Sequence, residues 1–359
     1  MKIGIVTQPL LGNYGGLMQN FALQSVLRRL GHEPVTLDYI WSLRWQRYIL
    51  TTIKTALLWF VPGRRRKFAI FRPVRENKKI DDFVRDHINT TEYIYRYRQS
   101  TLKKYCIDGV ITGSDQVWRP MYNPDLKDMY LDFVRKDDIR RVAYAASFGT
   151  SEREYTSKEV NNCLRGVRRL DAVSVREASG IELCREYFGV EAGEVLDPTL
   201  LLTADDYCEL SKNIPIAQDK YLGAYILDDK PYYNEVAHDV CSRIGADRVY
   251  KVIGKEKALS PIEWIAMFRD AEFIVTDSFH GTVFSIIFQK PFITFCNHSR
   301  GAERFRSLLA PLGLMNRLVE LDNSDISGLL NIPIDWKSVS EKLNINRKRS
   351  INFLKETLG

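Results

Sequence analysis

The sequence predicts an α/β protein built from two Rossmann-like domains that face each other across a cleft. Three observations predict this fold. The chain has 359 residues, which exceeds one ordinary core and suits two domains of about 150 residues each. Short β-branched runs alternate with helical stretches, a pattern typical of parallel sheets covered by helices on both faces. Hydrophobic residues make up 45% and charged residues 27% of the chain, as in ordinary globular proteins.

The apolar runs place the expected elements in order. Strands are expected at Lys2–Thr7, Val35–Tyr39, Gly109–Gly113, Arg141–Phe148, Ala172–Arg176, Tyr221–Leu227, Arg248–Ile253, Phe273–Thr276 and Pro291–Cys296. Helices are expected at Gly16–Leu30, Pro261–Arg269 and Trp336–Leu358. We expect a first domain over residues 1–170, a second domain over 171–335, and a last helix, 336–359, that packs across the join.

The positive charge of the chain is concentrated in one insert. The net charge is +7, but residues 41–80 hold 11 Lys/Arg and a single Glu, which leaves the remaining residues at −3. This distribution argues against a nucleic-acid binder, and no nucleic-acid partner is expected. Residues 41–60 have the spacing of an amphipathic helix and precede a basic run at 63–67. Two interpretations stay open: an interfacial helix on an anionic membrane, or a helix that covers the first domain.

Targeting and redox features are sparse. No run of about 18 uncharged apolar residues occurs, and the N-terminus lacks the apolar stretch of a signal peptide. The six cysteines never approach CxxC spacing, so reduced thiols and no metal site are expected. We therefore expect a cytoplasmic protein, with peripheral contact to the inner membrane surface through 41–67 as a hypothesis.

A glycine-rich turn, residues 12–24, follows the first strand and leads into a helix. Such a turn leaves backbone N–H groups free at the helix N-terminus, where a phosphate or sugar hydroxyl can bind. An acceptor-binding role is therefore expected for Asn13, Tyr14, Gly15, Gly16 and Gln19. The spacing differs from GxGxxG, so a dinucleotide fingerprint is not indicated. The alternative is a tight turn whose glycines serve packing alone.

A second polar segment, residues 110–118, follows the strand that ends at Gly113. Side chains at the carboxyl end of a parallel strand open onto a crevice. We expect Ser114, Asp115 and Gln116 to hydrogen-bond sugar hydroxyls, and Trp118 to offer a flat face to a sugar ring. A helix capped by Ser114 or Asp115 is the structural alternative.

The most informative segment, residues 273–293, contains the sequence TDSFHGT. A buried strand ends at Thr276, and Ser278 is a natural cap for a helix that begins near Gly281. His280 then lies on a strand-to-helix turn, at the positive end of a helix dipole where an anion binds. We expect His280 to be catalytic and Ser278, Gly281 and Thr282 to bind the donor. His298, at another strand end, is the competing histidine.

An anionic donor also requires cations. Arginine provides planar, bidentate donors for carboxylate and phosphate. Arg176 follows an apolar strand, and Arg300 and Arg304 follow the strand after TDSFHGT. These three arginines are the candidate donor-binding cations.

Seven segments follow one another along the chain: GNYGGLMQNFALQ, ITGSDQVW, YAASFG, VSVRE, EVLDPTLLL, TDSFHGTVFSIIFQKPFI and RGAERFRSLL. In these segments the chain resembles the polysaccharide pyruvyl transferase family. The resemblance covers nearly the whole length, and the order and spacing of these segments carry it. It implies a two-domain arrangement like that of GT-B glycosyltransferases. It also implies phosphoenolpyruvate as co-substrate, with no cofactor, and a pyruvate ketal on two sugar hydroxyls of a glycan or lipid-linked acceptor. By the same resemblance, His280 is the general acid/base and Arg176 a donor-binding residue.

Two segments depart from the family pattern. Some members carry a basic residue just before the histidine turn, where this chain has Asp277-Ser278-Phe279, and many have a GQGIGP-like loop where it has AASFGT at 145–150. Our hypothesis is that Arg300 or Arg304 supplies the cation that is missing before the histidine turn. A nucleotide-sugar-dependent GT-B glycosyltransferase is the main rival, but no acidic residue lies between Asp277 and Glu303 to grip a ribose. The second rival is a glycan-binding protein without catalysis.

Overall fold

The computed structural model describes residues 1–40, 77–123, 125–228, 230–252, 259–296, 301–320 and 326–359. The membrane-contact hypothesis rests on residues 41–67, which lie outside this described part, as does most of the 41–80 insert. No helix in the described ranges is long and apolar enough to cross a membrane. The six cysteines all lie in these ranges, where they form no disulfide.

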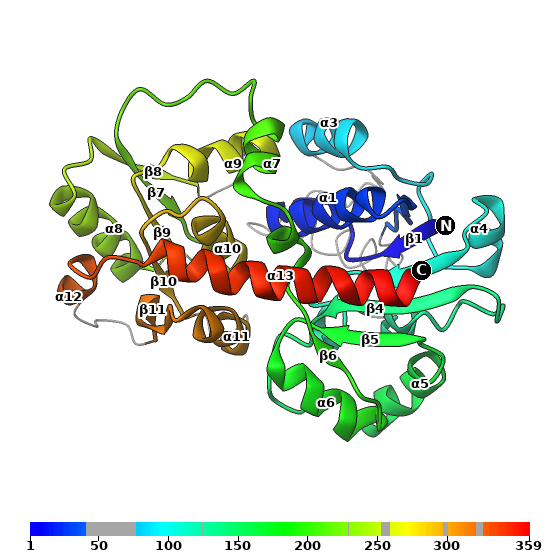
Figure 1. The fold of residues 1–359 in the computed structure, drawn as a ribbon. Helices are drawn as coiled ribbons and strands as arrows, with labels where there is room; N and C mark the ends of the chain where they lie inside the picture. Colours follow the sequence, from blue (N-terminus) through cyan, green and yellow to red (C-terminus); the bar gives the residue numbers. More distant parts are fainter. Residues whose placement is uncertain (41–76, 124, 229, 253–258, 297–300, 321–325) are drawn as a thin grey trace, which may run out of the picture.

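Two parallel sheets form the framework, and the predicted fold class is confirmed (Figure 1). The first sheet has the order β2 (Glu33–Thr36), β1 (Lys2–Val6), β3 (Gly109–Thr112), β4 (Arg140–Ala146), β5 (Ala172–Val175), β6 (Gly193–Glu194). The second sheet has the order β11 (Leu318–Val319), β10 (Phe292–Phe295), β9 (Phe273–Thr276), β7 (Tyr221–Tyr225), β8 (Arg248–Lys251). Every expected strand is present, and the two-residue strands β6 and β11 are additional. The central strands β3 and β9 are buried throughout and mostly apolar because helices cover both faces of each sheet.

The domain boundary lies later than expected. Both β5 and β6 pair within the first sheet, so a division between residues 170 and 171 would cut through that sheet. The second sheet begins only at Tyr221. The sequence obscured this because β6 has two residues and carries no recognisable strand pattern.

Each sheet reverses its strand order at one point. The first reverses between β1 and β3, and the second between β7 and β9. Loops that leave neighbouring strands at such a point turn to opposite faces of the sheet and open a crevice at the carboxyl ends of the strands. Both reversal points lie toward the join between the domains, which places the crevice there.

The helices cover the sheets and also connect them. The helices in chain order are α1 (Tyr14–Arg29), α3 (Lys78–His87), α4 (Gln99–Lys104), α5 (Ser157–Val167), α6 (Ala178–Phe188), α7 (Ala204–Leu210), α8 (Pro231–Arg243), α9 (Pro261–Asp270), α10 (Phe279–Ile287), α11 (Ala302–Leu312), α12 (Ser327–Leu330) and α13 (Trp336–Leu358). A 3-10 turn, η3 (Pro198–Leu201), lies on the segment between the two sheets.

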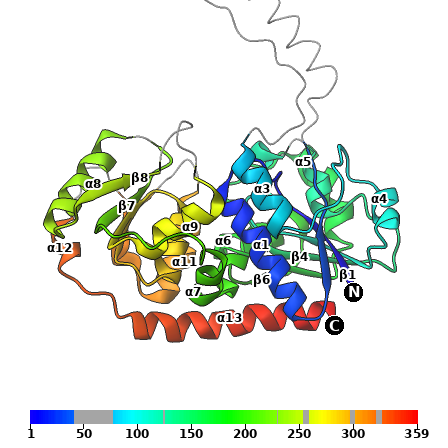
Figure 2. The ribbon, with the colours of Figure 1, turned by 90° about the horizontal axis from the view of Figure 1, so that it is seen from above.

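Of the three apolar clusters formed by the described residues, one spans both domains. A single cluster of buried side chains runs from Ile5 on β1 through Trp264 on α9 to Leu354 on α13. Across the join, Tyr14 stacks on Trp264 with ring centroids 5.4 Å apart, and its hydroxyl donates to the carbonyl of Leu259 at 2.6 Å. The final helix α13 extends along both domains and contacts α11 and β4 (Figures 1 and 2). Burial of this shared apolar surface stabilises the arrangement of the two domains.

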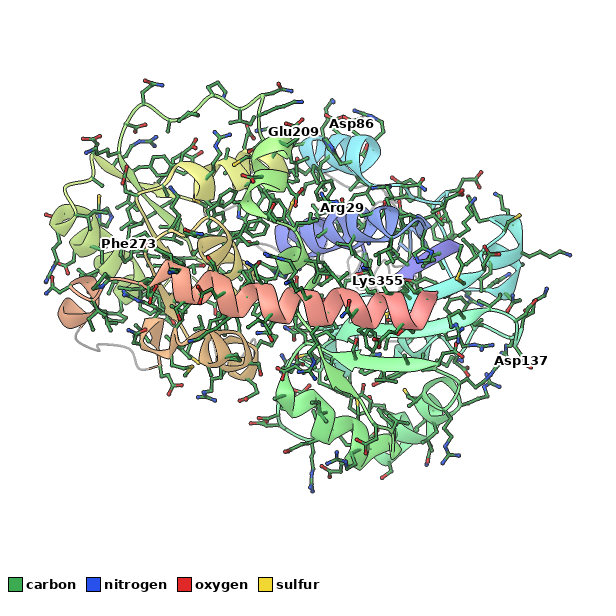
Figure 3. The ribbon with its side chains drawn as sticks, viewed as in Figure 1. Arg29, Asp86, Asp137, Glu209, Phe273 and Lys355 are labelled. Carbon is green, nitrogen blue, oxygen red and sulfur yellow. The ribbon has the colours of Figure 1, made fainter. Side chains whose placement is uncertain are left out.

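The outer surface has the opposite character. The side chains of Asp86, Asp137 and Lys355 lie on the exposed periphery, whereas Phe273 is buried within the second domain (Figure 3). Arg29 on α1 forms an ion pair with Asp206 on α7 at 2.5 Å, near the join. Charged side chains thus lie mainly at the periphery, and the buried polar groups gather around the crevice.

Candidate active site

A cleft of about 670 Å³ lies where the two sheet-reversal points face each other. Its walls come from the loops after β1 and β3 on one side and after β7 and β9 on the other. The lining residues are Gln8, Pro9, Leu11, Gly12, Asn13, Asp115, Gln116, Met121, Tyr122, Tyr225, Leu227, Asp277, Ser278, Phe279, His280 and Arg304. The volume falls in the range that holds a sugar together with a small donor.

His280 enters the cleft from the first turn of α10. Strand β9 ends at Thr276, and the hydroxyl of Ser278 caps the helix by accepting from the backbone N–H of Gly281 at 3.3 Å. The expected cap is therefore confirmed, although the helix begins two residues earlier than expected, at Phe279. The His280 side chain is only 8% exposed and lies at the helix end that favours negative charge.

Gly15 provides the space that the imidazole occupies. A β-carbon at this position would lie 1.9 Å from Nδ1 of His280, so a side chain there is excluded. The glycine-rich turn of the first domain thus packs directly against the histidine of the second. Because Gly15 has no side chain, its backbone can approach the His280 ring closely.

Replacing Gly15 with alanine is expected to displace the His280 ring and to lower activity strongly, while the fold is retained. The new methyl group would overlap an imidazole that is itself buried and has little room to move. The measurement is turnover together with the melting temperature. Gly193→Ala is the control, since a β-carbon there meets nothing within 4 Å. Full activity in Gly15→Ala would contradict the packing argument.

Asp197 is the hub of the buried polar network beside His280. Its Oδ2 accepts from Arg176 Nη1 at 2.7 Å and from the Ser114 hydroxyl at 2.8 Å, and its Oδ1 accepts from Thr199. Oδ2 also lies 3.8 Å from Nε2 of His280. Burial alone would raise the pKa of Asp197, but His280 and the Arg176 guanidinium outweigh it and hold that pKa far below its usual range. An ionised carboxylate therefore faces the imidazole.

Two buried arginines surround the ring of Phe279. The guanidinium carbon of Arg176 lies 4.5 Å from the ring centroid, and that of Arg304 lies 5.5 Å from it. Burial lowers the pKa of Arg176, but the carboxylates of Asp197, Asp115 and Glu177 outweigh burial and raise it. Burial and the charge of Arg176 lower the pKa of Arg304 to about 10, so both groups are cationic at neutral pH. Arg304 lines the cleft, whereas Arg176 is not among the lining residues and donates a hydrogen bond to Asp197.

The unusual residues before the histidine have definite structural roles. The Asp277 carboxylate accepts from the backbone N–H groups of Leu227 and Asp228 at 2.6 and 2.9 Å, which fixes the loop after β7. Ser278 caps α10, and Phe279 packs against both arginines. The lead-in lacks the basic residue expected in some members of the family, and Arg304 on α11 lies over the ring of Phe279 in the same turn.

The AASFGT loop, residues 145–150, also has a structural role. The Ser147 hydroxyl and the Gly149 backbone N–H both donate to Oε1 of the buried Glu177, at 2.8 and 3.0 Å. Gly149 in turn contacts Gly301, at the N-terminus of α11, so closely that a β-carbon on Gly301 would lie 1.8 Å from the Gly149 carbonyl oxygen. The loop therefore connects the first domain to the helix that carries Arg304.

Asp115 faces the cleft from the first domain in a strained conformation. Its φ of 74° is unusual for a residue other than glycine. Its Oδ2 accepts from Asn13 Nδ2 at 3.1 Å, and its Oδ1 lies 3.8 Å from Arg176 Nη2. Gln116 lines the cleft beside it. These three polar side chains, from two loops, are placed to meet hydroxyl groups of a ligand.

Several residues expected at the site lie in the core instead. Trp118 is 1% exposed, stacks on Tyr130 and donates to the Met129 carbonyl, so its face is not available to a sugar. Tyr14 joins the domains, and Gln19 is buried beside Thr7. Between β3 and β4 the described residues form 3-10 turns and no α-helix, so neither Ser114 nor Asp115 caps a helix there.

The remaining expected residues support the site from behind. Ser114 bonds Asp197, and the hydroxyl of Thr282 pairs with Thr294 in the core. A β-carbon on Gly281 would lie 2.2 Å from Thr276 Oγ1, so this glycine allows tight strand-to-helix packing. Gly16 contacts Asn13. Arg300 and the competing His298 lie outside the described residues.

Sequence reasoning missed Asp197 and Glu177 as site residues. Both are completely or almost completely buried acids, and acids are almost never buried without a partner. The signal in the sequence was their placement, Glu177 directly after Arg176 and Asp197 before Pro198 at a turn. The described residues contain no group of three or more His, Cys, Asp or Glu arranged for a metal ion.

Comparisons with known proteins give the family and the fold of the chain. A family profile described as polysaccharide pyruvyl transferase matches residues 13–299. The UDP-GlcNAc 2-epimerase of Neisseria meningitidis bound to UDP-GlcNAc has 10% identity and a TM-score of 0.50, over 100% of this chain and 99% of that chain. A Listeria monocytogenes chain described as a UDP-N-acetylglucosamine 2-epimerase has 9% identity and a TM-score of 0.51, over 99% and 90%. At such identities the structural likeness shows the fold alone, which is GT-B-like. Curated protein sequences give no significant match.

Proposed function

Because the chain belongs to the polysaccharide pyruvyl transferase family, we propose that it transfers the pyruvyl group of phosphoenolpyruvate onto two hydroxyls of a sugar. The observation that carries this proposal is the placement of His280. A buried imidazole lies at a helix N-terminus, 3.8 Å from a carboxylate, in a cleft between two domains that the cationic Arg304 also lines.

The chemistry requires one proton donor and two proton acceptors. Protonation of the methylene carbon of phosphoenolpyruvate by His280 gives an oxocarbenium-like centre, which the first sugar hydroxyl attacks as it loses its proton. The C–O bond to phosphate then breaks, and the second hydroxyl attacks and completes the ketal. Of the two hydroxyl protons, one restores His280 and the other leaves with phosphate. The Asp197 carboxylate lies 3.8 Å from Nε2 of His280 and is placed to orient the imidazole ring.

The two walls of the cleft suit the two substrates. We assign the donor to the wall formed by Ser278, His280 and Arg304, where a helix N-terminus and a guanidinium attract its carboxylate and phosphate. We assign the acceptor hydroxyls to Asn13, Asp115 and Gln116 on the opposite wall. The carboxylate of Asp115 can accept a hydrogen bond from an acceptor hydroxyl and so orient it for the attack.

The rim of the cleft suits an acceptor with an apolar part. Leu11, Met121 and Leu227 line the cleft yet are 43%, 65% and 40% exposed. Exposed apolar side chains gathered at one opening are typical of a binding surface. This rim supports a lipid-linked sugar as the acceptor over a free polysaccharide.

Phosphoenolpyruvate is expected to raise the melting temperature of the protein, and a nucleotide-sugar is not. A ligand that binds only the folded state stabilises it by about 2.7 kcal/mol at 100 times its dissociation constant. The measurement is a thermal melt with each ligand, followed by phosphate release from phosphoenolpyruvate with candidate glycans. Stabilisation by a nucleotide-sugar alone would favour a glycosyltransferase instead.

A further inference from the structure

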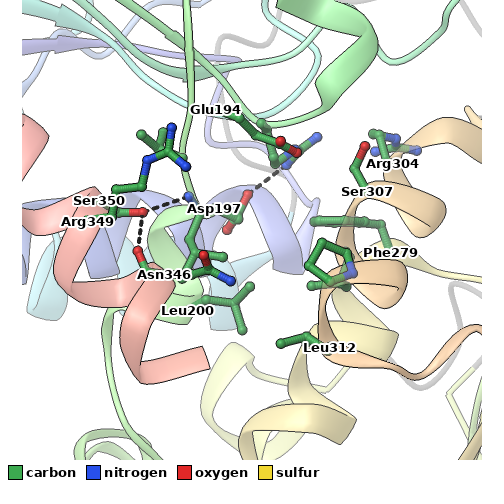
Figure 4. A pocket seen from close by; sticks show the side chains of 15 residues that line it. Glu194, Asp197, Leu200, Phe279, Arg304, Ser307, Leu312, Asn346, Arg349 and Ser350 are labelled. Atoms are coloured by element: carbon green, nitrogen blue, oxygen red, sulfur yellow. Dashed lines mark hydrogen bonds and ion pairs between the residues drawn. The ribbon is translucent and has the colours of Figure 1, made fainter. Parts of the chain in front are cut away.

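Two cavities lined by described residues lie at the join of the domains, and they differ in size. The larger is the cleft of about 670 Å³. The smaller has about 80 Å³ and shares Phe279 and Arg304 with the cleft (Figure 4). One water molecule needs roughly 10–15 Å³ of such space, so the smaller cavity holds about five to eight of them. A hexose has more non-hydrogen atoms than that, and of the two cavities only the cleft can hold one.

The aromatic side chains that line the cleft differ in how much of their rings is covered. Tyr225 is 7% exposed, and its ring meets that of Trp264 edge-on. Phe279 is 5% exposed and has two guanidiniums over its ring. Tyr122, by contrast, is half-buried. Among these three described lining residues, Tyr122 therefore offers the most accessible ring to a ligand.

Arg119 supports the ring of Tyr122 from one side. Its guanidinium carbon lies 5.5 Å from the ring centroid, within the range of a cation–π contact. Arg119 is itself held by Glu154, to which it donates through Nε at 3.0 Å and Nη2 at 2.7 Å, and its side chain is 8% exposed. Its Nη1 also donates to Oε1 of Gln116, which lines the cleft. A fixed guanidinium thus covers one face of the ring, and the other face is left for the cleft.

The backbone that carries Tyr122 is also held in place. Pro120–Tyr122 form a 3-10 turn, in which the Tyr122 N–H donates to the Arg119 carbonyl at 3.1 Å. Nδ2 of Asn123 donates to backbone carbonyls of the same loop at 2.7 to 3.3 Å, and its Oδ1 accepts from Nε2 of Gln8 at 2.9 Å. A side chain that is ordered before its ligand arrives loses less conformational entropy on binding.

Tyr122 lies close to the groups that the proposed reaction uses. Gln116, which shares Arg119 with Tyr122, is one of the residues assigned to the acceptor hydroxyls. On the donor wall, burial lowers the pKa of Arg304 most, and Tyr122 is among the nearby groups that raise it. The phenol is therefore within electrostatic range of the arginine assigned to the donor. A sugar ring that rests on Tyr122 has its hydroxyls near both walls.

We propose that Tyr122 is the stacking platform for a pyranose ring of the acceptor, which binds through a ring face made of C–H groups. The face of an aromatic ring is apolar and carries partial negative charge, so it attracts hydrogens bound to carbon. The sequence predicts this role for Trp118, which is buried in the core, and Tyr122 in the same loop takes its place. The inference deepens the proposed function and rests on it for identifying the bound sugar as the acceptor.

The test is saturation-transfer NMR of the full chain with the methyl pyranosides of glucose, galactose and mannose, in the absence of phosphoenolpyruvate. Tyr122→Ala is expected to weaken the binding of these sugars about tenfold or more, as the loss of a central aromatic contact does. Tyr122→Phe keeps the ring and should retain most of the affinity. Ring-current shifts of the sugar C–H protons should persist in Tyr122→Phe and disappear in Tyr122→Ala, which a merely structural role does not predict.

Tyr95→Ala is the matched control. Tyr95 is 44% exposed in the first domain and is not among the residues that line the cleft, so its replacement should leave sugar binding unchanged. Melting temperatures show whether the variants are folded. Stabilisation by phosphoenolpyruvate should persist in Tyr122→Ala, because the donor is assigned to the opposite wall.

Three results would overturn the proposal: no binding of any of the three glycosides to the unaltered protein, equal affinity in Tyr122→Ala, or an equal loss in Tyr122→Phe or Tyr95→Ala. The sugars are titrated alone, so the result is independent of turnover. Failure of phosphoenolpyruvate to react would contradict the proposed function and leave the platform standing as a glycan-binding site. Release of phosphate from phosphoenolpyruvate without any effect of Tyr122→Ala on the sugar would do the reverse.

Discussion

His280→Ala is expected to lower the rate of phosphate release from phosphoenolpyruvate by about 10²–10⁴-fold, the usual contribution of a positioned general acid/base. His280 lines the cleft at the N-terminus of α10, and its Nε2 lies 3.8 Å from the Asp197 carboxylate. The loss should fall on kcat more than on KM, because proton transfer is needed in the transition state and contributes little to ground-state binding.

His238→Ala provides the control for this measurement. His238 is exposed on α8, in the second domain, away from the residues that line the cleft. Its replacement should leave both turnover and the melting temperature unchanged. If His280→Ala retained full turnover, His280 would not be the general acid/base, and a glycan-binding role without catalysis would gain support.

Asp197→Ala is expected to destabilise the fold by about 3–5 kcal/mol, the usual cost of breaking a buried ion pair from one side. The substitution leaves Arg176 buried without its 2.7 Å partner and removes the acceptor for Ser114 and Thr199. A small part of the cost comes from the turn η3, which Asp197 caps. Urea unfolding followed by circular dichroism gives the free energy of unfolding.

Asp239→Ala makes the same chemical change at the surface. Asp239 pairs with Arg243 at 2.9 Å, but both side chains are almost half exposed, and such pairs contribute about 0.2–1 kcal/mol. A loss in Asp197→Ala no larger than in this control would show that the buried network is not a stabilising unit.

The deficit of Asp197→Ala should also depend on pH. The folded protein holds the pKa of Asp197 below its unfolded value, so this carboxylate stabilises the fold above the unfolded pKa of about 4. That contribution shrinks as the pH falls below about 4, because the unfolded chain then takes up the proton. The difference in stability between the two proteins is therefore expected to narrow from pH 6 to pH 3, as measured by urea unfolding.

The sequence by itself determined the two-domain α/β fold and the neighbourhood of the site. Alternating apolar runs located the central strands because a parallel strand is buried on both faces and must be apolar along its length. The carboxyl ends of those strands then indicated Asn13, Asp115, Gln116 and His280, and all four line the cleft. The cap at Ser278 was readable because capping depends on residues next to each other in the chain.

Only the tertiary structure decided which polar and aromatic residues face the ligand. Trp118 was expected to stack on a sugar ring, and Tyr14 was expected to bind the acceptor. Both side chains pack instead against residues distant in the sequence, Trp118 on Tyr130 and Tyr14 on Trp264. The sequence did not indicate Asp197 as a site residue, because its partners Ser114, Arg176 and His280 come from three different segments of the chain. Local pattern records propensity and periodicity, whereas burial and charge pairing arise between elements that meet only when the chain is folded.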